Sequence, residues 1–371
     1  MAKKKITVSV ISELTTDQRV IRICHTLQRM GFAVTVFARE FADSLPLDRY
    51  AFEARRIKCI FRKGVMQYAE FNTRLFFKLL FCKTDYLLAN DLDTLAPNYI
   101  VSKWRRKKIF YDTHEYFTGV PELTASPFKK KIWKFFEDWI FPKLPVVYTV
   151  NDSVKEKYSA EYGNMISVVR NVPVTIKASP IEMPAAWQGK IILLMQGIGI
   201  NPGRGGLELL SAFRHLPGTY RLVYIGGGTE WEAIASRRKE WNLETRVEMI
   251  RKISPSELKR YTPLAALGFT LDGFENDNYR LNLPNKIFDY IHAGVPVVAT
   301  PIPEVKKIIE QYECGICLES LEPQQMAAQI ENLMGDRLLY ERLKNNTHSA
   351  ANDLCWEQEE KKLIAIYQPF L

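Results

Sequence analysis

Apolar residues recur along this chain in two forms, as short continuous runs and as runs with helical spacing. Near the N-terminus, Ile6–Ile11 is a short apolar run, Ser12–Arg19 is polar, and Val20–Met30 carries apolar residues at helical steps. Phe32–Ala38 is the next apolar run. This order of strand, loop, helix and strand predicts the opening of a doubly wound parallel sheet. No GxGxxG follows the first predicted strand, so the fingerprint of a dinucleotide-binding domain is absent.

The same alternation continues through the first half of the chain, stops, and then begins again. Residues 171–190 contain three prolines and no clear period, which is typical of a linker between domains. The pattern resumes at Ile191–Met195. The sequence therefore predicts two α/β, Rossmann-like, doubly wound domains, residues 1–172 and 191–355, joined by a linker at 173–190. A ligand cleft is expected between two such domains.

Composition indicates a soluble protein with packed cores. The chain has 371 residues, of which 47% are hydrophobic, and no apolar run reaches the length of a membrane span. The start, MAKKKITVSVIS, lacks the pattern of a signal peptide. Six scattered cysteines favour a reduced, cytoplasmic setting. Cys314 and Cys317 form a lone CxxC, which does not indicate a zinc site.

The net excess of positive charge is confined to the first half of the chain. Residues 1–170 hold 29 Lys and Arg against 18 Asp and Glu, whereas residues 171–371 hold 22 against 24. The excess predicts an anionic partner, which could be an acidic lipid surface, a nucleic acid or a phosphorylated substrate. Residues 59–83 mix basic and large apolar side chains, as in a core-facing helix with a basic outer face or a helix on a membrane surface. Trp104–Lys108 and the segment 127–144 add two basic, aromatic-rich patches, but no nucleic-acid-binding module accompanies the charge.

Two polar motifs follow predicted strands in the first half. Asp91-Leu92-Asp93 has the spacing that can hold a divalent metal, but acids are also common at loop starts and helix caps, and we favour the second interpretation. His114 lies just past the strand Lys108–Tyr111. The carboxyl ends of parallel strands are where open sheets bind ligands, so His114 is a candidate site residue.

Glycine loops follow two predicted strands in the second half. One runs from Gln196 to Gly206 and contains Arg204, and the other is Gly226-Gly227-Gly228. Such loops let the backbone approach a phosphate, and arginine matches phosphate oxygens with two hydrogen bonds.

A helix predicted to start at Pro284 adds a second cation. Lys286 falls in its first turn, where a positive charge is disfavoured unless an anion is present. Free N–H groups at a helix start also attract anions. The loops, Arg204 and Lys286 together predict a diphosphate site in the second domain.

These motifs resemble the GT-B glycosyltransferases, in particular family four of the retaining enzymes, in a divergent subgroup with a PNK signature. The resemblance spans nearly the whole chain and is carried by PNKIFDYIHAGVPVVAT, GIGINPGRGG, IGGG and YDTHE. It implies that the second domain holds a nucleoside diphosphate sugar and that the first domain binds the acceptor. It also implies that residues 356–371 form a helix that returns to the first domain. Neither a metal nor another cofactor is expected.

The resemblance assigns roles to individual residues. His114 would lie near the transferred sugar, Arg204 would contact the diphosphate, and Asp289 would bind the ribose hydroxyls. The catalytic residues would be His114, Arg204 and Lys286. The donor-binding residues would be Gly197, Gly199, Gly203, Gly205, Gly227, Asn285, Lys286 and Asp289.

Three positions depart from the family pattern. The acid expected eight residues before Asp289 is replaced by Leu281, and Glu275 or Asp277 could substitute for it. A second cation common in the family, five residues before Arg204, is replaced by Gly199, so Lys286 would supply that charge. The glycine-rich loop of the first domain is replaced by SELTTDQR at 12–19.

The function predicted from these observations is retaining hexosyl transfer from a UDP or GDP sugar to a glycan or lipid-linked acceptor. Such a reaction would serve surface polysaccharide or glycoconjugate synthesis. The protein would be cytoplasmic, with the basic first domain on the inner face of the cell membrane. The alternatives are a sugar-nucleotide epimerase of the same fold and a catalytically inactive nucleotide-sugar-binding subunit.

Overall fold

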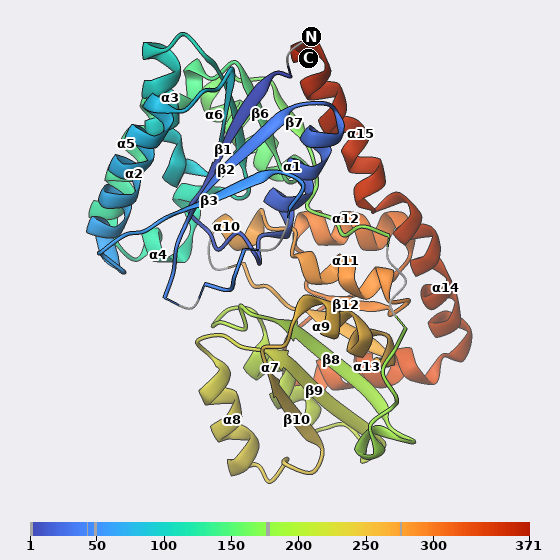
Figure 1. Ribbon diagram of the computed structural model, residues 1–371. Helices are drawn as coiled ribbons and strands as arrows, with labels where there is room; N and C mark the ends of the chain where they lie inside the picture. Colours follow the sequence, from blue (N-terminus) through green and yellow to red (C-terminus); the bar gives the residue numbers. More distant parts are fainter. Residues whose placement is uncertain (1–2, 43, 48–49, 176–178, 275–276) are drawn as a thin grey trace. The chain divides into compact units, whose positions relative to one another are not determined.

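A computed structural model describes residues 3–42, 44–47, 50–175, 179–274 and 277–371 of the chain. The chain divides into two compact units, one formed by Met1–Asn171 with Gln358–Leu371 and the other by Val172–Glu357 (Figure 1). Each unit contains one wholly parallel sheet with helices around it. Among the described residues, no helix is long and apolar enough to cross a bilayer.

The first unit is built on a seven-stranded sheet with the order β3-β2-β1-β4-β5-β6-β7. The strand order reverses direction next to β1, which is the topological switch of a doubly wound sheet. The strands are β1 Lys5–Val10, β2 Ala33–Arg39, β3 Glu53–Ile57, β4 Tyr86–Asn90, β5 Lys108–Thr113, β6 Val146–Thr149 and β7 Ile166–Val168.

The helices of the first unit lie on both faces of this sheet, and α2, α3 and α5 lie side by side on one of them (Figure 1). The α-helices are α1 Gln18–Arg29, α2 Gly64–Phe81, α3 Leu92–Trp104, α4 Pro121–Thr124, α5 Pro127–Ile140, α6 Asp152–Tyr162 and α15 Trp356–Tyr367. Short 3-10 turns are η1 Phe117–Gly119, η2 Phe141–Lys143 and η5 Gln368–Phe370. Asp17 is the N-cap of α1, and its carboxylate accepts a hydrogen bond from the N–H of Val20 in the first turn.

The second unit repeats the plan with six strands in the order β10-β9-β8-β11-β12-β13. They are β8 Ile191–Gly197, β9 Tyr220–Gly226, β10 Val247–Arg251, β11 Leu267–Thr270, β12 Val297–Ala299 and β13 Gly315–Cys317. Its α-helices are α7 Gly206–Phe213, α8 Trp231–Glu240, α9 Pro255–Tyr261, α10 Asp277–Arg280, α11 Asn285–His292, α12 Pro303–Tyr312, α13 Pro323–Gly335 and α14 Arg337–Asp353. Two 3-10 turns are η3 Ala185–Trp187 and η4 Thr262–Leu264.

The border region differs from the linker predicted at 173–190. The described residues of this segment are grouped with the second unit, and Trp187 is 1% exposed in its core beside Ile192 and Val223. The indole N–H of Trp187 donates to Glu248 at 2.7 Å. Prolines remove the periodicity that sequence reasoning relies on, but a single large side chain is enough to anchor such a segment.

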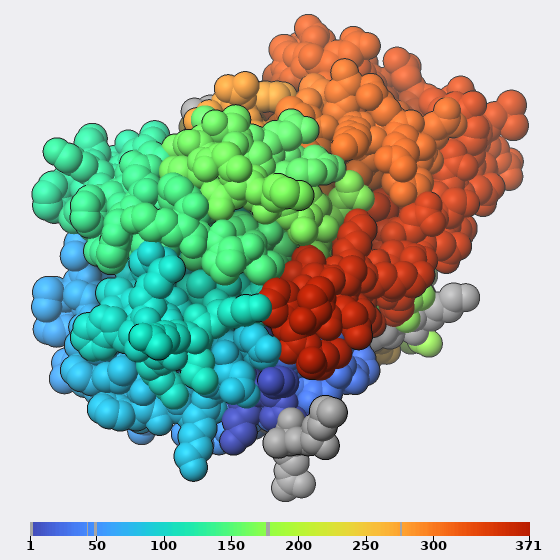
Figure 2. Space-filling view, turned by 90° about the horizontal axis from the view of Figure 1, so that it is seen from above, coloured from blue at the N-terminus to red at the C-terminus, as the bar shows by residue number. Residues whose placement is uncertain are grey.

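The C-terminal segment belongs to the first unit. Tyr367 is fully buried and stacks on Phe110 of β5 at 4.3 Å between ring centroids. The hydroxyl of Tyr86 donates to the carbonyl of Phe370, and Figure 2 shows the dark red C-terminal residues lying against blue and cyan residues of this unit. Burial of these rings explains why the last fourteen residues, Gln358–Leu371, leave the second unit.

The helix α11 is fixed to its sheet by one tyrosine. The ring of Tyr290 lies against Gly268 of β11, so closely that a Cβ at that glycine would be 2.3 Å from the ring. The Tyr290 hydroxyl accepts from the N–H of Gln196 at 3.1 Å and lies 3.2 Å from the carbonyls of Leu194 and Phe269. Position 268 must therefore be glycine for α11 to lie this close to β8 and β11.

The substitution Gly268→Ala tests this packing. Because the added methyl group meets a buried ring, we expect the variant to lose about 1–3 kcal/mol of unfolding free energy, measured by chemical denaturation. Gly218→Ala is the control, since a Cβ there has nothing within 4 Å, and we expect a change within about 0.5 kcal/mol. Equal stability of the two variants would contradict the close approach.

Candidate functional site

The two glycine loops of the second unit form one structure. The N–H of Gly227 donates to the carbonyl of Gly197 at 3.1 Å, and the N–H of Ile200 donates to the carbonyl of Gly227 at 2.9 Å. A Cβ on Gly226 would lie 1.9 Å from the Gly197 oxygen, and φ of Gly226 is 140°. Glycine at these positions is thus needed for the loops to meet at the carboxyl ends of β8 and β9.

The remaining glycines of this region divide into two kinds. Gly203 and Gly205 have φ of 78° and 76°, and a Cβ on Gly205 would meet the side chain of Leu271 at 2.2 Å. They bring the start of α7 close to β11. By contrast, a Cβ on Gly227 would meet nothing within 4 Å, and one on Gly199 would make an ordinary contact at 3.9 Å. Open space beside these two backbones is what a ligand needs for close approach.

Arg204 is held at this edge by an acid and a ring. Its Nη1 lies 3.6 Å from Oδ1 of Asp272, and its guanidinium lies 4.7 Å from the centroid of Tyr279. Asp272 follows β11 and is completely buried. The sequence analysis did not single out Asp272, although a carboxylate at the carboxyl end of a buried strand is a recognisable signal.

Lys286 lies in the first turn of α11 beside the same carboxylate. Burial lowers the pKa of Lys286, Asp272 acts to raise it, and the positive charge of Arg204 lowers it further. The structure therefore brings together the two cations that the sequence analysis assigned to a diphosphate. A bound anion would favour the charged form of Lys286 and so offset the effect of burial.

Asp289 is one helical turn after Lys286, so both side chains lie on one side of α11. The amide of Gln196 donates to Oδ2 of Asp289 at 3.4 Å, and the Gln196 carbonyl accepts from Thr262 at 2.9 Å. Thr262 holds the Gln196 side chain, so that Asp289 has a defined partner at the end of β8.

The other predicted donor-site positions are more scattered. Asn285 is exposed at the first position of α11, and Leu281 is half-buried in the turn after α10. Asp277 is exposed in α10 and lies 3.9 Å from Arg280. Glu275 lies outside the described residues. Asp272 is thus the carboxylate that the structure places beside the two cations.

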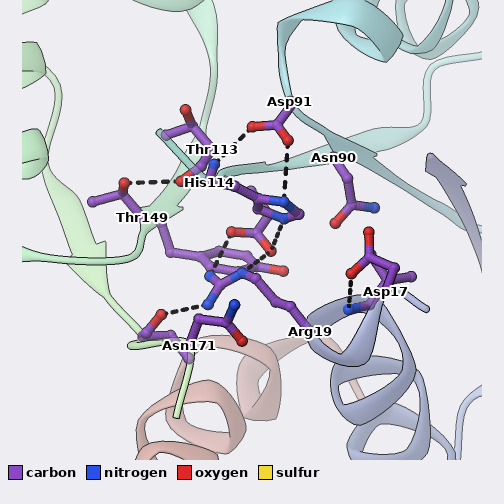
Figure 3. Close-up of polar contacts among 12 residues, drawn as sticks. Asp17, Arg19, Asn90, Asp91, Thr113, His114, Thr149 and Asn171 are labelled. Atoms are coloured by element: carbon purple, nitrogen blue, oxygen red, sulfur yellow. Dashed lines mark hydrogen bonds and ion pairs between the residues drawn. The ribbon is translucent and has the colours of Figure 1, made fainter. Parts of the chain in front are cut away.

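In the first unit, His114 lies between two carboxylates at the carboxyl ends of β4 and β5 (Figure 3). Its Nδ1 is 3.0 Å from Oδ2 of Asp91, and its Nε2 is 3.1 Å from Oδ2 of Asp112. The backbone N–H of His114 also donates to Oδ1 of Asp91 at 2.7 Å. Burial alone would lower the pKa of His114, but Asp91 and Asp112 together raise it well above its ordinary value. Both ring nitrogens of His114 therefore lie within hydrogen-bond distance of a carboxylate, and these contacts favour the charged form of the ring.

Asp112 is shared with a buried arginine. Arg19 of α1 donates from Nε and Nη2 to the two oxygens of Asp112, at 2.9 and 2.6 Å, and from Nη1 to the carbonyl of Val169 at 2.7 Å. Both side chains are at most 2% exposed. Burial would raise the pKa of Asp112, but Arg19 and His114 hold it below its usual value. This charged array joins α1, β5 and the residue after β7.

The Asp-x-Asp pair does not present two equivalent carboxylates. Asp91 is at the N-cap position of α3, but its carboxylate binds His114, and its backbone has φ 57° and ψ 168°, a region that few residues other than glycine adopt. Asp93 is 7% exposed, and burial with the nearby charge of Asp91 raises its pKa well above the ordinary value. Backbone strain such as that at Asp91 is characteristic of functional sites.

The titration of His114 can be measured directly by NMR. We expect its imidazole to stay protonated above pH 6.5, whereas burial and Arg29 lower the pKa of His25, which serves as the internal reference. Because the folded pKa lies above the unfolded one, the ion pairs contribute their full stability below about pH 6.5, and this contribution is lost as pH rises through the folded pKa. Asp91→Asn should lower the His114 pKa, and the exposed control Asp138→Asn should not. Joint titration of His114 with His25 below pH 6.5 would disprove the arrangement.

Comparison with known proteins places this geometry in context. Residues 199–350 match the family model described as Glycosyl transferases group 1. A sequence search of curated proteins finds no match. Among solved structures, the chain is similar to a sucrose-phosphate synthase from Thermosynechococcus elongatus, with a TM-score of 0.82, 16% identity and 99% of each chain covered.

Two further structures share the fold. HepE from Anabaena, solved with UDP-glucose, has a TM-score of 0.77 at 14% identity, with 99% of this chain and 100% of that chain covered. A UDP-N-acetylglucosamine 2-epimerase assigned in Listeria monocytogenes has a TM-score of 0.69 at 16% identity, with 100% and 97% covered. The prediction of two Rossmann-like domains is confirmed, and the chain has the GT-B fold, with a segment matching the Glycosyl transferases group 1 domain at residues 199–350.

Proposed function

We propose that this protein is a glycosyltransferase that moves a hexosyl group from a UDP or GDP sugar, with retention of anomeric configuration. The observation that carries the proposal is the grouping of Arg204, Asp272 and Lys286 between the starts of α7 and α11. The family match from 199 to 350 includes all three residues. The similar HepE structure contains UDP-glucose, which supports a nucleotide sugar as the donor here.

The two cations would stabilise the leaving nucleoside diphosphate. As the bond between the sugar and the diphosphate breaks, negative charge grows on the phosphate oxygens, and preorganised donors stabilise that charge. Arg204 offers a planar fork to two oxygens, and Lys286 offers a point charge beside the first N–H groups of α11. Asp272, whose Oδ1 lies 3.6 Å from Nη1 of Arg204, would help to position that guanidinium.

Retention follows if the acceptor hydroxyl attacks from the side of the leaving group. The sugar becomes oxocarbenium-like, the new C–O bond forms on the face that the diphosphate leaves, and a phosphate oxygen takes the hydroxyl proton. This route demands no nucleophile from the protein. Asp289 would accept hydrogen bonds from the ribose hydroxyls, with Gln196 setting its orientation.

We assign His114 to the hydroxyls of the transferred sugar, in line with the resemblance. Because it is held as an imidazolium by Asp91 and Asp112, it would act as a fixed positive group and not as a base. Its side chain is 20% exposed and that of Asp91 is 22% exposed, so the edge of this ion pair is within reach of a ligand. The imidazolium would exchange part of its contact with Asp91 for a sugar hydroxyl.

The acceptor is proposed to be a glycan or lipid-linked saccharide bound by the first unit, in surface polysaccharide or glycoconjugate synthesis. The basic excess of residues 1–170 supports a cytoplasmic protein that works at an anionic membrane surface. The epimerase alternative is favoured by the structural similarity to the Listeria protein. Product analysis separates the two, because an epimerase releases an altered sugar nucleotide without an acceptor.

Substitution of either cation should nearly abolish turnover and preserve the fold. We expect Arg204→Ala and Lys286→Ala to lower the rate of donor cleavage about 10²–10³-fold, because each removes a donor that stabilises the leaving group. The assay is release of free nucleoside diphosphate, with product configuration read by NMR. Exposed Arg237→Ala and Lys344→Ala are the matched controls and should keep full turnover. Full activity of Lys286→Ala would remove that residue from the site.

Donor identity can be tested without an acceptor. A ligand present at 100 times its Kd stabilises the native state by about 2.7 kcal/mol, so UDP or GDP should raise the melting temperature and ADP should not. Arg204→Ala should lose most of this shift, whereas Arg237→Ala should retain it. Equal shifts with all three nucleotides in both variants would show that binding is nonspecific and contradict the proposed donor site.

A further inference from the structure

Exposed apolar side chains are concentrated on one part of the first unit. Of the sixteen exposed large apolar side chains among the described residues, ten lie between Ile60 and Trp139. On α2, Phe77 and Phe81 are 53% and 79% exposed, and at the end of α3, Trp104 is 68% exposed. On α5 the exposed large apolar side chains are Phe128, Phe135 and Trp139.

Ring contacts connect the exposed positions of the three helices. Phe76 contacts both its neighbour Phe77 and Trp104, with centroids 5.3 and 5.6 Å apart, and so joins α2 to α3. Tyr99 of α3 contacts Trp139 of α5 at 5.7 Å, and Trp139 also stacks with Phe135. We call this surface, made by the outer sides of α2 and α5 and the C-terminal end of α3, the aromatic-basic face.

Positive charge covers the same helices. The three stretches 71–84, 94–111 and 125–136 contain twelve Lys and Arg and no Asp or Glu. Lys78, Lys83 and Lys103 are exposed beside the aromatic positions, and the ammonium of Lys103 lies 5.2 Å from the centroid of Tyr99. Long lysine side chains next to exposed rings let the rings enter an apolar layer while the charges stay in water.

The helical spacing shows why this surface is separate from the core of the unit. On α2, Phe71, Leu75 and Leu79 are fully buried against the sheet, while Arg74, Phe77, Lys78 and Phe81 are exposed at helical steps on the opposite side. The core-facing stripe explains the buried residues. It does not explain large aromatic side chains in the exposed stripe.

We propose that the aromatic-basic face docks on the surface of an anionic lipid bilayer. Charge complementarity favours this partner, since juxtamembrane Lys and Arg are attracted to acidic headgroups, and aromatic rings settle at the interface between headgroups and acyl chains. The inference rests on the proposed function only in that a lipid-linked acceptor would give the docking a purpose. No nucleic-acid-binding module accompanies these charges, which favours a lipid surface over a nucleic acid.

Sedimentation with lipid vesicles tests the docking. The full chain is mixed with vesicles of phosphatidylcholine and phosphatidylglycerol in a ratio of roughly 70:30, which gives an anionic surface. We expect binding to these vesicles at low salt, little binding to phosphatidylcholine alone, and release at high salt, because exposed charges are screened. A wild-type protein that stays in solution with acidic vesicles at low salt overturns the proposal.

Two variants separate charge from aromatic insertion. The charge variant carries Lys78→Glu, Lys83→Glu and Lys103→Glu, and its binding should weaken at least about a hundredfold. The aromatic variant carries Phe77→Ser, Phe81→Ser and Trp104→Ser, and its binding should weaken about tenfold while its salt dependence remains. Melting temperature and circular dichroism confirm that each variant is folded.

Control variants place the same charge changes, and two apolar-to-serine changes, elsewhere on the chain. Lys190→Glu, Lys239→Glu and Lys344→Glu change the net charge equally on the second unit, and Met165→Ser with Leu338→Ser removes exposed apolar side chains away from the face. Both controls should bind as the wild type does. Equal loss of binding in the face and control variants would show a dependence on net charge or on apolar content alone and would overturn the proposed face.

Donor cleavage without vesicles distinguishes this inference from the proposed function. The face variants should release nucleoside diphosphate at the wild-type rate in solution, because none of the changed residues lies among the proposed donor-binding residues. Vesicle binding without any sugar transfer would leave the docking face in place and reject the proposed function. Sugar transfer by a protein that never binds vesicles would reject the docking face and leave the proposed function in place.

Discussion

The contact between Tyr290 and Gly268 is the constraint on which the second unit depends. One ring lies flat against a glycine of β11, and its hydroxyl contacts the backbone of β8 at two residues. Because α11 is held at this distance from the sheet, its first turn starts beside the carboxyl end of β11. The position of Lys286 relative to Asp272 therefore depends on the packing of α11 against the sheet, and a larger residue at 268 would displace the helix together with Lys286 and Asp289.

Burial then determines how strongly those charges interact with one another. Asp272 is fully buried, its Oδ1 lies 3.6 Å from Nη1 of Arg204, and its charge acts to raise the pKa of Lys286 while that of Arg204 lowers it. A buried ion pair is weak evidence for stability, because desolvation offsets most of the attraction. An arrangement of two cations around one acid makes more sense as an anion site, in which a diphosphate completes the compensation that Asp272 begins.

Sequence reasoning could find the parts of this site that disturb a pattern. Lys286 stands out because a cation is unfavourable in a first turn, and the glycine loops stand out because glycine after a strand lets another backbone or a phosphate approach closely. Asp272 gave a weaker signal, since a carboxylate after a buried strand marks the ligand-binding edge of a sheet without disturbing any pattern. In the fold, the strand β3 was not predicted because Glu53–Ile57 is largely polar and lies at the edge of the sheet. The helix α3 was not predicted because it is buried on nearly all sides, so its apolar residues show little helical periodicity. Trp187 was assigned to a linker because proline removed the local pattern.

The first unit shows the limit of motif reasoning more sharply. Asp91 and Asp93 read as one motif, yet their surroundings differ, since the Asp91 carboxylate pairs with His114, whereas burial and the nearby charge of Asp91 raise the pKa of Asp93 well above its ordinary value. His114 lies 23 positions from Asp91 in sequence and comes beside it only when the sheet forms. Because Asp91 and Asp112 raise the pKa of His114 and contact both of its ring nitrogens, this histidine is better suited to hold a fixed position than to accept a proton. That property depends on contacts among β4, β5 and α1 that no single motif in the sequence contains.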